Sequence, residues 1–144
     1  MPELIRSFAA RVRKFFGDRR HAHRRHVRLS VSVAIQNPKT GEPLKNAGVL
    51  QGHTQDISPR GMAFVVPAIR MGEHYLTGDN RVLLITLQLP DIAMLVHATP
   101  SRYQRLDVED GDNSAHYLIG ARFTKMNDAD RARLVEFLLK LPKR

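Results

Sequence analysis

The feature that most constrains the fold is a two-residue alternation that begins near residue 27. Five apolar residues alternate with four small or polar ones: Val27, Leu29, Val31, Val33 and Ile35 against Arg28, Ser30, Ser32 and Ala34. A period of two is typical of a strand that buries one face. Residues 37–41, with the sequence Asn-Pro-Lys-Thr-Gly, end the pattern with turn-forming side chains. The segment therefore predicts a half-buried strand over 27–35.

Five further apolar runs follow, each of strand length. They cover residues 48–57, 62–66, 82–89, 93–105 and 116–123. Turn-forming clusters separate most of them, as at 77–80 and 109–113. About six short strands without a long helix between them favour an antiparallel barrel or sandwich. We therefore expect a mainly β domain.

The two ends of the chain carry helical patterns. In residues 4–16, the apolar side chains fall on one arc of a helix and the basic ones outside it: Leu4, Ile5, Phe8, Ala9, Val12, Phe15 and Phe16 against Arg6, Arg11, Arg13 and Lys14. Residues 127–141 resemble a second helix, with Asn127 as its cap and Pro142 just beyond its end. We expect two units, a helix over 1–18 and a β domain over 19–144.

The net charge of +9 is concentrated in the first 28 residues, which hold nine Arg or Lys and only two acids. Residues 18–28 contain many Arg and His residues and almost no apolar ones, so we expect this arm to be mobile without a ligand. A basic arm on a nearly neutral body favours a polyanionic partner. Nucleic acid, an anionic membrane and a phosphate-rich small ligand all qualify.

Two short motifs narrow this choice. The first is an RxxxR motif formed by Arg24 and Arg28, where the arm enters the first strand. The second is a DxSxxG motif formed by Asp56, Ser58 and Gly61, between two predicted strands. Each motif alone is common, and the second also suits an ordinary β-turn.

Together, on these elements, the two motifs resemble the signature of PilZ domains. The segments 61–64, 119–123 and 127–141 also resemble the central hairpin, last barrel strand and closing helix of that family. The resemblance covers roughly residues 19–141. It implies a six-stranded antiparallel β-barrel that binds cyclic di-GMP without altering it, with a basic arm at 19–28 and a C-terminal helix at 127–141.

The residue types suit that ligand. A guanidinium can form a fork onto the O6 and N7 edge of guanine or bridge phosphate oxygens. A carboxylate such as Asp56 can accept from guanine N1 and N2, and Ser58 adds a hydroxyl. Gly61 permits close backbone approach. We expect Arg24, Arg28, Asp56, Ser58 and Gly61 to bind the ligand.

Two further arginines, Arg20 and Arg25, are expected to make auxiliary phosphate contacts. Arg20 also forms an overlapping RxxxR pattern with Arg24, but Arg28 lies closer to the first strand. The simpler interpretation of all these arginines is a solvated basic linker.

The sequence offers no catalytic set, because Ser58 has no identifiable base, and we expect no enzyme activity. We expect no metal and no cofactor, since the three histidines of the arm have no partner ligands nearby. The chain has no cysteine and no signal-peptide pattern, which fits a cytoplasmic protein.

The main hypothesis is a receptor that passes ligand binding to an effector protein through reordering of the arm. One alternative is a nucleic-acid-binding barrel, which the low aromatic content of 6% and the absence of Trp disfavour. Another is a PilZ-like module that only binds proteins. Residues 4–16 could also contact a membrane surface, although packing on the barrel or a partner is the commoner role of such a stripe.

Overall fold

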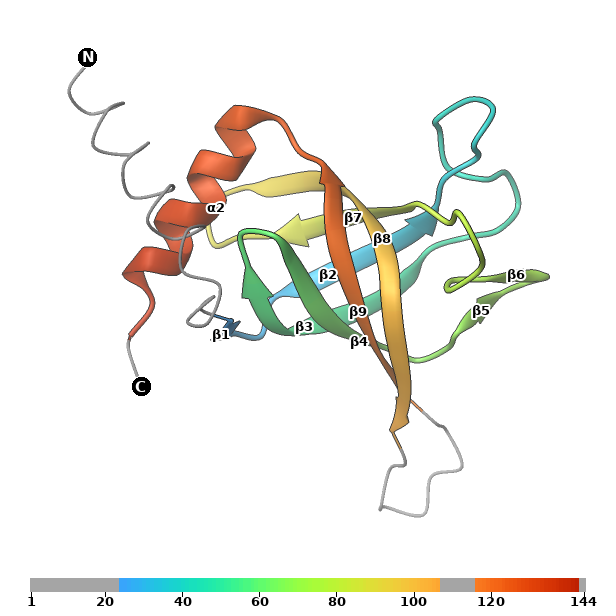
Figure 1. Ribbon diagram of the computed structural model, residues 1–144, viewed down its shortest axis with the longest axis horizontal. Helices are drawn as coiled ribbons and strands as arrows, with labels where there is room; N and C mark the ends of the chain where they lie inside the picture. The colour runs from blue at the N-terminus through green and yellow to red at the C-terminus, as the bar shows by residue number, and fades with distance from the viewer. Residues whose placement is uncertain (1–23, 107–115, 143–144) are drawn as a thin grey trace.

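The protein is a closed antiparallel β-barrel with a helix at one end (Figure 1). The structure is a computed structural model, and it describes residues 24–106 and 116–142. The barrel strands are β2 (Ser30–Ile35), β3 (Leu50–Ser58), β4 (Gly61–Val66), β7 (Leu83–Gln88), β8 (Ala93–Leu106) and β9 (His116–Lys125). These six strands confirm the fold class that the alternating pattern and the family resemblance predict.

The barrel closes because β3 and β4, at the two ends of the sheet order, pair with each other. The strands follow the order β3-β2-β7-β8-β9-β4, and β4 pairs back onto β3 through the tight turn at Ser58–Gly61. All of these pairings are antiparallel. The β3–β4 hairpin thus joins the two ends of the sheet, so the DxSxxG motif lies at the point of closure.

The barrel interior is filled by the inward-facing residues of the strands. Several of the largest are fully buried: Phe64, Ile35, Ile57, Leu83, Ile85, Leu87 and Ile119. Burial of apolar surface is the main stabilising term for such a domain.

The first predicted strand starts later than its alternation suggests. β2 begins at Ser30, and a separate two-residue strand, β1 (Arg25–His26), pairs with β3. Between them the side chain of Thr54 replaces part of the ladder, because its hydroxyl accepts from the backbone N–H of Leu29 at 2.9 Å and donates to the carbonyl of Val27. The alternation continues because Val27 and Leu29 still pack against the core.

The pairing of β1 with β3 involves the last residues of the predicted arm. Arg25 and His26 lie opposite Ile57 and Asp56, so the end of the arm is part of the sheet. Residues 18–23 lie outside the described residues, as do the helix predicted over 4–16 and Arg20.

One small hairpin has no counterpart in the sequence-based prediction. β5 (Arg70–Met71) pairs with β6 (His74–Tyr75) as a separate two-stranded sheet. Each strand is too short to show a period, so the alternation that predicts the other strands is absent here.

The C-terminal helix, α2 (Asp128–Lys140), lies against one end of the barrel, and the β2–β3 connection is at the opposite end (Figure 1). Asn127 caps it, accepting from the Asp130 N–H at 2.7 Å. Leu134 and Leu138 enter the core, and Arg131 Nη1 donates to the Pro59 carbonyl at 3.1 Å. The helix therefore fixes the β3–β4 turn. None of the described helices is long and apolar enough to cross a membrane.

Candidate functional site

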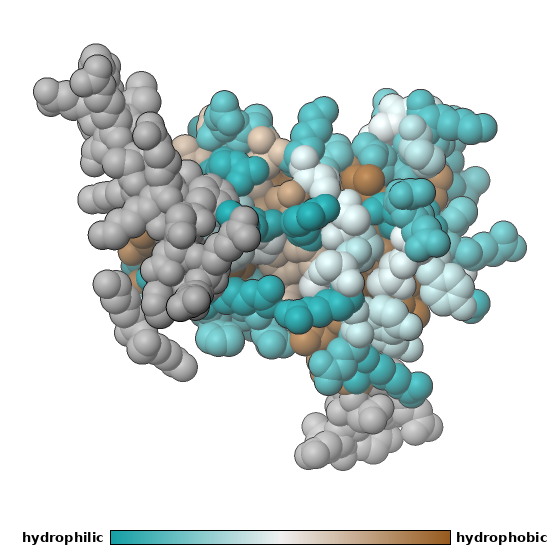
Figure 2. All heavy atoms as spheres, in the orientation of Figure 1, coloured by the Kyte–Doolittle hydropathy of each residue, from teal (hydrophilic) through white to brown (hydrophobic). Residues whose placement is uncertain are grey.

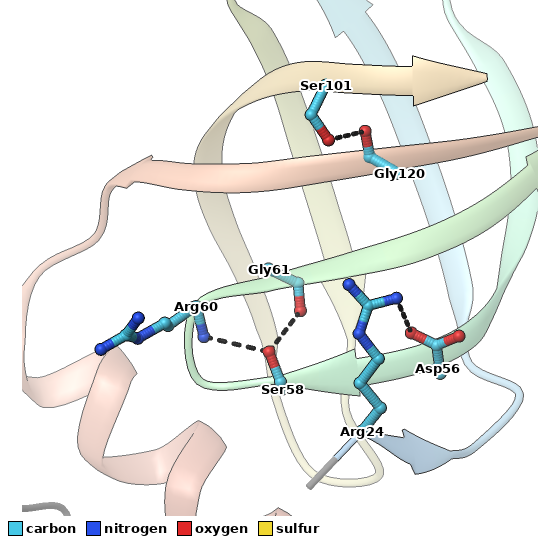
Figure 3. A network of polar contacts seen from close by, with 7 residues as sticks. All are labelled: Arg24, Asp56, Ser58, Arg60, Gly61, Ser101 and Gly120. Carbon is cyan, nitrogen blue, oxygen red and sulfur yellow. Dashed lines mark hydrogen bonds and ion pairs between the residues drawn. The ribbon is translucent and has the colours of Figure 1, made fainter. Parts of the chain in front are cut away.

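The β3–β4 hairpin holds three of the predicted site residues, and the side chain of Ser58 stabilises its turn. Ser58 Oγ accepts from the Arg60 backbone N–H at 3.2 Å and makes a longer contact, 3.4 Å, to the Gly61 carbonyl (Figure 3). The Arg60 carbonyl accepts from the Phe123 N–H at 2.8 Å, which ties the turn to β9. The hydroxyl of Ser58 therefore has a structural role in addition to the predicted one.

Gly61 is required by packing between strands. A Cβ atom at this position would lie 2.3 Å from the carbonyl oxygen of Ala121 on β9, well inside contact distance. Its φ is not in the left-handed region, so a turn conformation is not the reason for glycine. The sequence predicts close backbone approach at Gly61, and the structure shows approach by β9.

The hairpin begins a row of outward-facing residues that crosses four strands. Asp56 on β3 lies opposite Ala63 on β4, Ala63 opposite Gly120 on β9, and Gly120 opposite Arg102 on β8. Residues opposite each other share a face of the sheet. The row thus has a carboxylate at one end, a guanidinium at the other, and no bulky side chain between.

A second row runs beside the first. Ser58 lies opposite Gly61, Gly61 opposite Arg122, and Arg122 opposite Thr99. The neighbouring residues Ile57 and Met62 belong to the core cluster, whereas Asp56 and Ala63 are buried but do not belong to it. Because side chains alternate along a strand, both rows lie on the outer face of the sheet. We call the surface formed by these two rows the floor.

Arg102 lies across the floor because Gly120 leaves room for it. A Cβ atom at Gly120 would be 3.1 Å from both Cγ and Nε of Arg102. Ser101 Oγ also donates to the Gly120 carbonyl at 3.0 Å (Figure 3). Gly120 therefore positions a cation at the end of the floor opposite Asp56.

Arg24 is the residue that joins the two predicted motifs. Its guanidinium lies over the hairpin, with Nη1 3.8 Å from Oδ1 of Asp56 (Figure 3). The Asp56 side chain is 9% exposed and that of Arg24 is 56% exposed. A long ion pair to a largely exposed partner contributes little to stability. The carboxylate is thus held by the sheet, and the arginine can move away from it.

Two grooves meet at Arg24. The floor groove, of about 550 Å³, is lined by Arg24, Ser58, Gly61 and by three further arginines: Arg60, Arg102 and Arg122. Figure 2 shows strongly hydrophilic side chains crossing this face among paler surface. Sequence reasoning missed these three arginines as site residues. Arg122 could be found from the pairing of β4 with β9, which places it opposite Gly61. The position of Arg102 depends on a bulge in β8.

The arm groove, of about 610 Å³, lies on the other side of Arg24. Arg24, Arg25, Arg28 and His53 line it, together with Leu141 and Pro142 after α2. Burial lowers the pKa of His53 below its usual value of 6.5, and the positive charges of Arg28 and His116 lower it further. The groove thus has an excess of positive charge.

The structure therefore divides the predicted site residues between two neighbouring grooves. Arg24, Ser58 and Gly61 line the floor groove, with Asp56 beside Arg24. Arg25 and Arg28 line the arm groove, where Nε of Arg25 is buried and has no hydrogen-bond partner among the described residues. Within residues 24–106 and 116–142, no cluster of three His, Cys, Asp or Glu side chains could hold a metal ion.

The fold and these grooves define a small closed β-barrel with an open, basic face beside a short arm. A sequence profile of the PilZ domain matches residues 18–140. The chain belongs to the PilZ domain family. A search of curated proteins gave no significant match.

Solved structures share the fold at low sequence identity. MrkH of K. pneumonia has a TM-score of 0.59 and 18% identity, over 81% of this chain and 46% of that one. The Bacillus subtilis inhibitor of motility MotI/DgrA has a TM-score of 0.51 and 15% identity, over 81% and 47%. This chain thus spans about half the length of either protein.

A third structure is a single domain of similar size. The PilZ domain of YcgR from Escherichia coli, solved with c-di-GMP, has a TM-score of 0.54 and 17% identity. The match covers 83% of this chain and 91% of that domain. At these identities the likeness shows the fold of the barrel.

Proposed function

We propose that the protein is a non-catalytic receptor for cyclic di-GMP that binds the ligand on the floor beneath Arg24. The observation that carries the proposal is the arrangement of the floor. The acceptors Asp56 and Ser58 lie on β3, the guanidinium donors Arg122 and Arg102 lie on β9 and β8, and small residues lie between them. Family membership over residues 18–140 supports the same ligand.

The floor suits a flat base with a donor edge and an acceptor edge. Ala63 and Gly120 carry no bulky side chain, so a purine ring would lie against the sheet once the Arg102 side chain, which covers Gly120, turns away. Asp56 would accept from guanine N1 and N2, while an arginine would donate to O6 and N7 or to a phosphate. Adenine offers no such donor pair to a carboxylate, so the chemistry favours guanine.

The long ion pair between Arg24 and Asp56 suggests how binding begins. A guanine edge would replace the Arg24 guanidinium at the carboxylate, and Arg24 would turn to a phosphate or to the base. Hydrogen bonds between charged groups and such partners are among the stronger ones in proteins. Arg25 and Arg28 in the arm groove, and Arg20 outside the described residues, would then bind the phosphates.

Movement of the arm would convert binding into a signal. β1 has only two residues, so its pairing with β3 can change at small cost. A ligand shifts such an equilibrium only by its difference in affinity for the two arm positions. We propose that an effector protein in the cytoplasm recognises the ligand-bound arrangement.

The alternative of a nucleic-acid-binding barrel has less support. Single strands bind barrels through aromatic stacking platforms on the strands. The floor rows consist of Asp, Ala, Gly, Arg, Ser and Thr, with no aromatic side chain in either row. The Ser58 hydroxyl is engaged by backbone groups of its own turn, which likewise does not favour catalysis.

Isothermal titration calorimetry with the full chain tests the proposal. Cyclic di-GMP should bind at least tenfold more tightly than GMP or cyclic di-AMP, which corresponds to about 1.4 kcal/mol. A short oligonucleotide should bind weakly. Equal binding of the oligonucleotide, with a steep dependence on salt, would favour the nucleic-acid function instead.

A further inference from the structure

One side of α2 is apolar but does not belong to the barrel core. Leu134 and Leu138 are part of the core cluster, and Phe137 and Leu141 pack against it. At about 100° per residue, Ala132, Val135 and Leu139 form a separate arc of about 60°, and its centre lies roughly 140° from the centre of the core-facing residues. We call these three residues the α2 side face.

Burial on this face shows that it is not simply solvated. Val135 is 0% exposed, yet it is not among the residues that form the core cluster or pack against it in the described part of the chain. Leu139, one turn further along the helix, is 37% exposed. A fully buried valine outside the core cluster must be covered by other atoms of the protein, and an apolar surface is the favourable cover.

The segment outside the described residues that precedes Arg24 can reach this face. Arg24 lines the same groove as Leu141 and Pro142, which directly follow α2. Residues 17–23 can span at most about 25 Å, whereas the 13 residues of α2 extend over about 20 Å. A segment that ends at residue 16 can therefore lie along the whole helix.

The sequence of that segment is complementary to the face in both polarity and charge. Residues 4–16 carry one apolar arc, with Arg6, Arg11, Arg13 and Lys14 outside it. Asp128, at the start of α2, lies within the arc of the side face, Glu136 lies beside it, and both are exposed. Amphipathic helices commonly bind by placing their apolar residues on such a surface.

We infer that residues 4–16 dock on the α2 side face of the same chain, over Val135 and Leu139. The inference stands apart from cyclic di-GMP binding, because none of its residues line the floor groove. It assigns the basic amphipathic segment an intramolecular site next to the arm, so that a change in the arm would act directly on it.

Paramagnetic relaxation measured by NMR tests this in the full chain. The protein has no cysteine, so Arg133→Cys places a single nitroxide on α2 outside the side face. The amide signals of residues 4–16 should lose most of their intensity. A nitroxide at Lys39→Cys is the matched control, because the β2–β3 connection lies at the far end of the barrel (Figure 1), and it should leave those signals unchanged.

A second variant connects the effect to the face. Leu139→Asp, in the Arg133→Cys background, should restore the signals of residues 4–16. Leu139 is partly exposed, so the barrel should stay folded. Leu95→Asp, at an exposed leucine on β8, is the control and should restore nothing.

Three outcomes would overturn the inference. The first is full signal intensity for residues 4–16 with the nitroxide on α2. The second is loss of intensity only when labelled and unlabelled chains are mixed, which would mean docking on a second copy. The third is contact of the segment only with vesicles of anionic lipid. The calorimetric test of cyclic di-GMP binding is independent of all three.

Discussion

The two motifs that identify the site are built in different ways. In the β3–β4 hairpin, Ser58 and Gly61 hold the turn and the packing of β4 on β9, while they also line the floor groove. In the arm, Arg24 and Arg28 are exposed and line the grooves without entering the core. The hairpin residues therefore have a structural role beside their proposed binding role, whereas the two arm arginines have only the proposed binding role.

This difference teaches which residues report on binding alone. A substitution in the hairpin would change the shape of the barrel together with the proposed binding face, so a loss of binding there would have two causes. A substitution in the arm removes a charge from a groove and leaves the sheet intact. The following predictions test that contrast, in order of decreasing effect.

The largest effect is expected for Gly61→Ala. The new Cβ would lie 2.3 Å from the Ala121 carbonyl, so β4 and β9 must move apart. We expect unfolding free energy to fall by about 3 kcal/mol, with binding lost as well. Urea denaturation followed by circular dichroism measures this.

Gly78→Ala is the matched control for that substitution. Its Cβ would meet only the end of the flexible Arg81 side chain, at 3.3 Å. Stability should change by less than about 1 kcal/mol. Equal losses of unfolding free energy in both variants would show that the close contact between Gly61 and β9 is not the reason why this position requires glycine.

Substitution of either motif arginine should affect binding and not folding. Arg24→Ala or Arg28→Ala should each weaken cyclic di-GMP binding by about 1.5–3 kcal/mol, the range for hydrogen bonds to charged groups. Calorimetry gives the binding loss, and thermal melting should be nearly unchanged. Arg70→Ala, next to Tyr75 in the separate hairpin, is the control. A sharp drop in melting temperature for Arg24→Ala would contradict the proposed separation of roles.

Ser58→Ala should show the mixed behaviour of the hairpin on a smaller scale. The variant loses the hydroxyl that accepts from the Arg60 N–H, at a cost of about 1 kcal/mol in unfolding free energy. Binding should weaken by a similar amount. Loss of binding at unchanged stability would place Ser58 with the arm residues instead.

The smallest effect is a pH dependence of stability from His53. Burial, Arg28 and His116 lower the pKa of His53 below 6.5, so the folded state takes up a proton less readily than the unfolded chain. This contribution to stability is present above pH 6.5 and is lost as pH falls through the lowered pKa. In His53→Gln, unfolding free energy should therefore decrease less between pH 7 and 5, measured by urea denaturation. An unchanged slope would contradict this, and His74→Gln on exposed β6 is the control.

Much of the fold follows from local sequence, because the strand signal is a local period. The alternation at 27–35 and the runs up to 123 predict all six barrel strands, and Asn127 and Pro142 bracket the last helix. The break at Val27–Leu29 is not predictable in this way, because it depends on the side chain of Thr54, which is 25 residues from Leu29.

The site residues likewise fall into two groups, those that local sequence predicts and those that depend on contacts between distant strands. Each of the two motifs is a short continuous stretch of sequence, and together they indicate Arg24 and Asp56. The structure places Nη1 of Arg24 3.8 Å from Oδ1 of Asp56. Arg102 and Arg122 reach the floor only through the pairing of β8, β9 and β4, including a bulge in β8. The requirement for glycine at position 61 likewise comes from close packing against Ala121, which is 60 positions later in the sequence.

The most direct test of the floor as the binding face is an NMR titration of the full chain with cyclic di-GMP. The largest amide shift changes should fall in the two rows and at Arg24, most clearly at Asp56, Ala63, Gly120 and Arg122. Residues of β2 and β7 should change little. Shift changes confined to another surface, such as the groove between Pro90 and Phe137 beside α2, would contradict the account.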